Sequence, residues 1–148
     1  MASILELRRK IDDLDINQVS VDAITKTDAI AADIQVKQQL NGVDAKGKEM
    51  PYYSPVSVEV FGKPEGPIKL RDTGAFQRGI YVKAMGDKIT ISSTDDKTKM
   101  LEERFGKKGF SILGLNSGSR KEWKEDLQPV LIDIVKKKRK TEVNQIKD

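Results

Sequence analysis

Two pairs of adjacent carboxylates, Asp95-Asp96 and Glu102-Glu103, are the first residues that could take part in acid–base chemistry. Such chemistry needs carboxyl groups held at fixed distances, in environments that separate their pKa values. Neighbouring residues in a turn or on a helix surface point in different directions, so we interpret both pairs as solvated charges. The sequence contains no histidine and no cysteine. This excludes Ser-His-Asp and Cys-His catalysis, and any metal site ligated by those two residue types.

The glycine-containing stretch from Gly74 to Gly79 is the candidate for phosphate binding. Glycine-rich loops bind phosphate when they open a helix and expose its backbone N–H groups. This stretch lacks the Walker spacing and the Lys-Ser/Thr pair that follows it. We therefore expect no bound cofactor, no metal and no enzymatic activity.

A run of basic residues near the end of the chain could bind a polyanion. It consists of Lys136, Lys137, Lys138, Arg139 and Lys140. Such runs contact nucleic acid or acidic surfaces, but lysines at a helix C-terminus also complement the helix dipole. Two interpretations stay open: a solvated helix end, and a contact with DNA or an acidic partner. The net charge of +4 is uneven, because the first part of the chain is acidic, which favours contacts specific to each end.

The segment from Leu70 to Phe76 predicts a turn that leads into a strand. Asp72 and Thr73 suit hydrogen bonds to the local backbone, and Gly74 suits a positive φ. Leu70 and Phe76 are expected to anchor the turn in the core. We assign this motif a structural role, which is to set the direction of the strand.

These residues must be positioned by helices at both ends of the chain and a hairpin between them. A first helix is expected from Ser3, with the capping-box residue Glu6, to about Asp15. A second is expected from about Val19 or Ser20 to Leu40, with an apolar side and a polar side rich in Asp, Gln and Lys. We interpret the polar side as solvated, or in part as a contact with another subunit.

Residues 41–70 are rich in glycine and proline and predict an irregular arm or loop. Within it, Val56, Val58 and Val60 alternate as in a strand. Ser54-Pro55, in contrast, is typical of a helix N-cap followed by proline at the first helical position. Strand and helix both stay open for residues 56–61. A loop of this length in a small domain is usually functional or disordered.

A β-hairpin is predicted from Ile80 to Ser93. Gly86-Asp87 suits a two-residue turn in which glycine takes the positive φ. The apolar residues of the two strands are expected to face the core: Ile80, Val82, Ala84, Ile89 and Ile91. A turn at residues 94–97 closes the hairpin.

Two helices and a short strand are expected after the hairpin. The first helix runs from Lys99 to Phe105, with Met100, Leu101 and Phe105 inward. The strand is Ile112–Leu115. The last helix begins near Arg120 and carries an apolar stripe: Trp123, Leu127, Val130, Leu131, Ile134 and Val135.

Pro129 falls inside that last helix and is expected to kink it. From Lys136 the apolar pattern is lost, and residues 141–148 are expected to fray. We therefore predict one α+β domain over residues 1–148. Its parts are N-terminal helices (1–40), an irregular arm (41–70), an α+β core with the C-terminal helix (71–135) and a basic tail (136–148).

The order of these motifs resembles the virion-morphogenesis and tail-completion proteins of tailed bacteriophages. The resemblance covers roughly residues 41 to 115. It consists of a glycine-rich turn, PYYSP at 51–55, LRDTGAF at 70–76, the hairpin, LEERFG at 101–106 and ILGL at 112–115. It implies a compact α+β domain that assembles into a ring and joins the portal side of the head to the tail, or caps the tail. The chain departs from many relatives in its N-terminal helices and its lysine-rich end.

The partners implied by the resemblance are further copies of the chain and other neck, portal-adaptor or tail proteins, close to genomic DNA. The implied location is the virion, with the host cytoplasm during assembly. We expect no membrane contact, because no apolar run approaches the eighteen or so residues that span a bilayer, and residues 1–10 lack the apolar region of a signal peptide. The alternative function is a small basic nucleic-acid-binding protein. A coherent basic face would favour that alternative, and a dispersed pattern with one basic tail favours a scaffold.

Overall fold

The computed structural model describes residues 16–85 and 88–147. Helix α2 (Ile16–Lys26) and helix α3 (Asp28–Leu40) are followed by α4 (Pro55–Phe61) and the one-turn α5 (Ala75–Arg78). Strands β1 (Ile80–Met85) and β2 (Lys88–Ser93) come next, then α6 (Thr98–Gly106) and α7 (Ser117–Lys147). The predicted helix from Ser3 to Asp15 and the predicted turn at Gly86-Asp87 lie outside the described residues.

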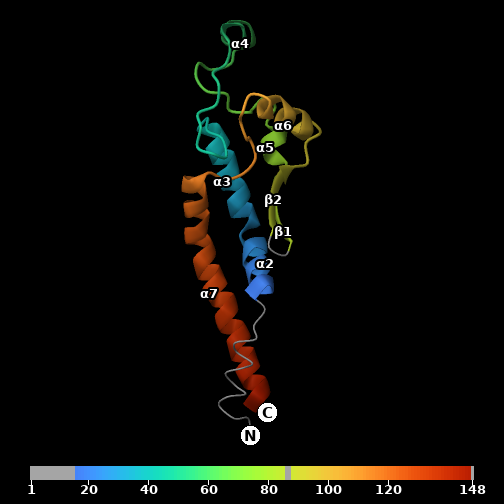
Figure 1. Ribbon diagram of the computed structural model, residues 1–148, viewed down its shortest axis with the longest axis vertical. Helices are drawn as coiled ribbons and strands as arrows, with labels where there is room; N and C mark the ends of the chain where they lie inside the picture. The colour runs from blue at the N-terminus through green and yellow to red at the C-terminus, as the bar shows by residue number, and fades with distance from the viewer. Residues whose placement is uncertain (1–15, 86–87, 148) are drawn as a thin grey trace.

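The predicted α+β fold is confirmed: the two strands form an antiparallel hairpin, and helices from both ends of the chain pack against it. Figure 1 shows an elongated molecule in which α7 runs beside α2 and α3, with the hairpin along the other side of these two helices. One core cluster joins α3, β1 and α7 through Ala31, Ile34, Val82, Leu115 and Trp123. A second lies around Met50, Phe76, Ile80, Phe105 and Ile112, and a third joins α2 to α7.

The helix expected to run without a break to Leu40 is interrupted at Thr27, which separates α2 from α3. The polar side of α3 also differs from the prediction, because Gln35, Gln38 and Gln39 are buried. They bond to the backbone of the segment after α6. The Gly114 amide donates to Gln35 Oε1 (2.8 Å), and Gln38 Nε2 donates to the Gly114 carbonyl (2.8 Å).

The segment Ile112–Leu115 was predicted to be a strand, but it is not one. The hydrogen bonds with the α3 glutamines explain why. The carbonyl at Ile112 accepts from Gln39 Nε2 (3.2 Å), and the Asn116 amide donates to Gln38 Oε1 (2.9 Å). The backbone groups are therefore bonded by side chains of a helix instead of a neighbouring strand, as buried backbone polar groups require. Ile112 and Leu115 are nonetheless buried in the core.

The hairpin has the predicted strands, with Ala84 opposite Ile89 and Val82 opposite Ile91. Ile80 and Val82 are buried, but Ile89 is 48% exposed. Ile89 was therefore wrongly predicted to face the core, because it pairs with Ala84 at the turn end of the hairpin, beyond the buried part of the strands. In α6, likewise, Phe105 is buried and Leu101 half-buried, whereas Met100 is 52% exposed and was wrongly predicted to face the core.

Residues 56–61, for which strand and helix were both expected, lie in helix α4. The Ser54 hydroxyl accepts a hydrogen bond from the Ser57 amide (3.1 Å), and Pro55 occupies the first turn.

Helix α7 begins at Ser117, where Asn116 Oδ1 accepts from the Ser119 amide (2.9 Å), and it continues through Pro129 to Lys147. The fraying expected after residue 140 is therefore replaced by helix. No helix within residues 16–85 and 88–147 is long and apolar enough to cross a bilayer.

Candidate functional site

The turn from Leu70 to Phe76 leads into α5, one helical turn before strand β1, and not directly into the strand as we expected. Gly74 has a φ of +84°, and Thr73 Oγ1 accepts a hydrogen bond from the Ala75 amide (3.3 Å). Phe76 is buried in the second core cluster, and Leu70 packs against that cluster. Leu70 itself has a φ of +56°, a conformation that costs a non-glycine residue of order 1–3 kcal/mol.

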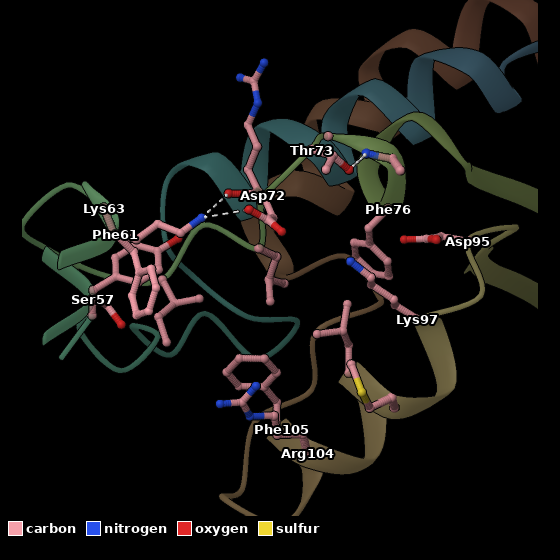
Figure 2. A pocket seen from close by; sticks show the side chains of 18 of the residues that line it. Ser57, Phe61, Lys63, Asp72, Thr73, Phe76, Asp95, Lys97, Arg104 and Phe105 are labelled. Atoms are coloured by element: carbon pink, nitrogen blue, oxygen red, sulfur yellow. Dashed lines mark hydrogen bonds and ion pairs between the residues drawn. The ribbon is translucent and has the colours of Figure 1, made fainter.

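This turn forms one wall of a groove between the arm that carries α4 (residues 41–70, the α4 arm) and α6, with a volume of about 670 Å³. Figure 2 shows Phe61 and Lys63 of the arm on one side and Asp95 and Lys97 on the other, with Phe105 of α6 below them. The apolar part of the lining includes Ile68, Leu70, Phe76, Met100, Leu101 and Phe105. A groove of this size and apolar character is within the range of ligand and peptide sites.

The charged part of the lining is mostly basic. It contains the acidic residues Asp72 and Asp95, and the basic residues Lys63, Arg71, Lys97, Arg104 and Lys108. Lys63 Nζ lies 3.4 Å from Asp72 Oδ1 and also donates to the Arg71 carbonyl (3.3 Å). Within the described residues, the other four basic side chains form no ion pair. The groove therefore presents an apolar floor with excess positive charge around it.

Tyr52 lies at the edge of the same groove and is largely exposed. A hydrogen bond to the Glu49 carboxylate, with the charge of that carboxylate, raises the pKa of Tyr52 above its ordinary value of 10.0. The phenol O–H is directed at that carboxylate. It adds polar character to the arm side of the groove.

The basic run lies on the last part of α7, at the opposite end of the molecule from the groove (Figure 1). Lys136, Lys137, Arg139 and Lys140 are exposed. Lys137 pairs with Asp133 one turn earlier (3.0 Å), and Lys138 Nζ lies 3.4 Å from Asp22 Oδ2 on α2. The lysines thus combine one contact to the folded body with an exposed basic stretch of the helix.

The two carboxylate pairs do not converge on a common point. Asp95 lines the groove, Asp96 is exposed in the turn before α6, and Glu102 and Glu103 are exposed on α6. Among the described residues, no group of three or more Asp or Glu side chains is arranged to hold a metal ion.

The basic residues of the groove were missed as a group by sequence reasoning. Lys63 comes from the end of the arm, Arg71 from the turn, and Lys97, Arg104 and Lys108 from α6 and its flanks. No local spacing connects these segments. The sequence feature that could have indicated this groove is the position of the turn motif, residues 70–76, between the arm and the hairpin.

Comparisons of the chain with models of protein families, with curated proteins and with solved structures found no match.

Proposed function

We propose that this protein is a structural component of a tailed-bacteriophage virion, of the neck or tail-completion type. In this role, copies of the chain form a ring that joins the portal side of the head to the tail, or caps the tail. The proposal starts from the ordered motifs between residues 41 and 115. Its partners are other copies of the chain and the neighbouring neck, portal-adaptor or tail proteins.

The observation that carries the proposal is the unburied apolar surface of α4. No residue of this helix is buried, and Val56, Val60 and Phe61 are 59%, 68% and 70% exposed. In Figure 1 the helix lies at one extremity of the molecule, away from the hairpin and α7. Apolar side chains gathered at such a projection are typical of an interaction site. In a ring, a neighbouring subunit could cover these apolar side chains, which the single chain leaves exposed.

The distribution of basic residues gives less support to the nucleic-acid-binding alternative. The basic groove and the basic run of α7 lie toward opposite ends of the molecule. Duplex binding proteins concentrate lysine and arginine on one face. Two separated groups fit contacts with two different neighbours in an assembly.

Two measurements test the proposal. The first is cryo-microscopy of purified virions, in which density for this fold is expected between the capsid and the tail. The second is the mass of the purified protein, alone and mixed with the neighbouring virion proteins, where a ring is expected at least in the mixture. Recovery of the protein only from infected cells, and never from purified virions, would contradict the proposal.

A further inference from the structure

The groove between α4 and α6 has the features of a receptor for a short amphipathic helix. Its floor is apolar, with Leu70, Phe76 and Phe105 among the lining residues. Its basic residues outnumber its acidic ones, and Arg71, Lys97, Arg104 and Lys108 form no ion pair with described residues. Grooves of this kind bind a helix through side chains spaced three or four residues apart.

Helix α4 itself carries the complementary set of side chains. Val56 and Val60 are four residues apart, so they lie on the same side of the helix. Both are exposed, and neither lines the groove of its own chain, to which α4 contributes Ser57 and Phe61. Glu59 is the one charged residue between Pro55 and Phe61. The helix therefore offers an apolar pair and a single carboxylate.

We propose that α4 of one copy docks into the groove of the next copy, with Val56 and Val60 on the apolar floor and Glu59 facing the basic residues of α6 and its flanks. This inference rests on the proposed ring function and adds the contact that would build the ring. Each α4 would then have two roles, as a wall of its own groove through Phe61 and as the occupant of the next. A contact between two different surfaces repeats from copy to copy and closes into a ring when the rotation permits.

The chain contains no cysteine, so single engineered cysteines give an unambiguous test. Val60→Cys places a thiol on the docking helix, and Met100→Cys places one in the groove lining. Met85→Cys is the matched control, since Met85 is as exposed as Val60, at 68%, but lies on β1 outside the groove. Because all three side chains are exposed, the substitutions are expected to leave the melting temperature unchanged.

The chain with Val60→Cys would be mixed with a chain that carries either Met100→Cys or Met85→Cys, so that each chain has one cysteine. The mixtures would be prepared from concentrated purified proteins and, separately, by co-expression during virion production. After mild oxidation, linked dimers are separated on a non-reducing gel and the joined peptides identified by mass spectrometry. We expect the Val60–Met100 pair to link at least several-fold more than the Val60–Met85 pair. Adding Glu59→Lys to the Val60→Cys chain should reduce this linkage several-fold by placing like charges together.

The outcomes separate this inference from the proposed function. Rings present in virions without preferential Val60–Met100 linkage overturn the docking and leave the ring function standing. Linkage of Val60→Cys to a different virion protein also overturns it, because that protein would then occupy the role of the neighbouring copy. Preferential linkage in a protein whose native mass stays at two chains, alone and mixed with the neighbouring virion proteins, would indicate reciprocal exchange in a closed dimer and overturn the head-to-tail arrangement. Absence of the protein from virions overturns the proposed function itself.

Discussion

The indole nitrogen of Trp123 donates a hydrogen bond of 3.0 Å to the hydroxyl oxygen of Thr27, and both residues are buried. Thr27 lies at the break between α2 and α3, and its hydroxyl also donates to the Ala23 carbonyl (3.0 Å). One side chain therefore closes the end of α2 and fixes α7 against the N-terminal helices. This bond joins residues that are far apart in the sequence.

Replacing Thr27 with valine should destabilise the protein by about 1–3 kcal/mol, because the buried indole N–H of Trp123 loses its acceptor. Thr25→Val is the matched control. Thr25 bonds in the same way to a carbonyl four residues earlier, that of Val21 (2.8 Å), but it is exposed. Chemical denaturation of both variants measures the difference. Equal losses would show that the indole bond contributes nothing beyond the local helix contact.

Gly74→Val should lower the melting temperature and the yield of assembled virions. The backbone at this residue has a φ of +84°, where a β-branched side chain is strained, and the expected cost is about 1–3 kcal/mol. The nearest atom to an added Cβ is the end of the Arg78 side chain, at 2.8 Å, which can move. The strain is therefore the main effect.

Three substitutions serve as controls for Gly74→Val. Gly106→Ala lies at the end of α6, where φ is not positive and no atom obstructs a Cβ, so it should be neutral or stabilising. Asp95→Asn and Glu102→Gln alter charges that we interpret as solvated and should change melting little. A Gly74→Val protein with unchanged melting and assembly would show that the turn does not need glycine.

Asp44→Ala should cost at least about 2 kcal/mol, because it leaves several backbone amides without an acceptor. The buried Asp44 carboxylate accepts from the amides of Lys46 (3.0 Å), Lys48 (2.8 Å) and Ser111 (3.1 Å). Asp72→Asn, at an exposed ion pair, is the control and should cost less than about 1 kcal/mol. Thermal or urea unfolding of the two variants gives the comparison. A loss for Asp44→Ala no larger than the control would refute this assignment.

The stability contributed by Asp22 should depend on pH. The hydrogen bond from Gln18 Nε2 (2.8 Å), followed by the contact with Lys138, lowers the pKa of Asp22 below its ordinary value of 3.8. A carboxyl whose folded pKa is depressed stabilises the fold above its unfolded pKa and loses this contribution as pH falls through the folded pKa. Melting of wild type and Asp22→Asn should therefore differ at pH 7 and converge well below pH 3.8. A difference that persists in strong acid would contradict it.

Deletion of residues 136–148 should shift the melting temperature little. Ile134 is the last buried residue of α7 within the part whose side chains are described, and the Lys138–Asp22 pair is half exposed, which limits its contribution to about 1 kcal/mol. If the lysines contact DNA or an acidic neighbour, the deletion should weaken that binding. Binding through phosphates should also fall steeply with salt. Melting, DNA binding at two salt concentrations and particle assembly give the readouts.

A large loss of thermal stability on this deletion would mean that the end of α7 packs on the body. Normal stability, normal assembly and no salt-sensitive binding would leave the lysines as a solvated helix end.

The elements that could be predicted from sequence are those whose signal is local. The hairpin strands show their alternation within six residues each, and the apolar stripe of α7 needs only helical spacing. Over residues 56–61 two local signals competed. The Ser54-Pro55 cap prevails there because the sheet of the described residues is the β1–β2 hairpin, which leaves the valines no strand to pair with, and a helix satisfies its own backbone.

The predictions that failed depend on distant partners. Ile112–Leu115 has the composition of a strand, but its hydrogen-bond partners are glutamine side chains of α3. These glutamines were interpreted as solvated, because nothing within the helix indicates that a loop some 75 residues later covers them. The groove is of the same kind, since three separate segments supply its basic residues. Spacing along the chain cannot reveal such a site.

The base of the α4 arm is closed before any partner arrives. Tyr52 and Pro67 form an isolated antiparallel bridge, the Ile68 amide donates to the Pro51 carbonyl (2.9 Å), and the Lys69 amide donates to the Tyr53 hydroxyl (3.1 Å). Between these contacts, Ser54 and Gly62 cap the two ends of the helix. The loop-closure entropy of the arm is thus lost during folding of the single chain. Docking then proceeds between two ordered surfaces, so association should be limited by their encounter and not by a disorder-to-order step.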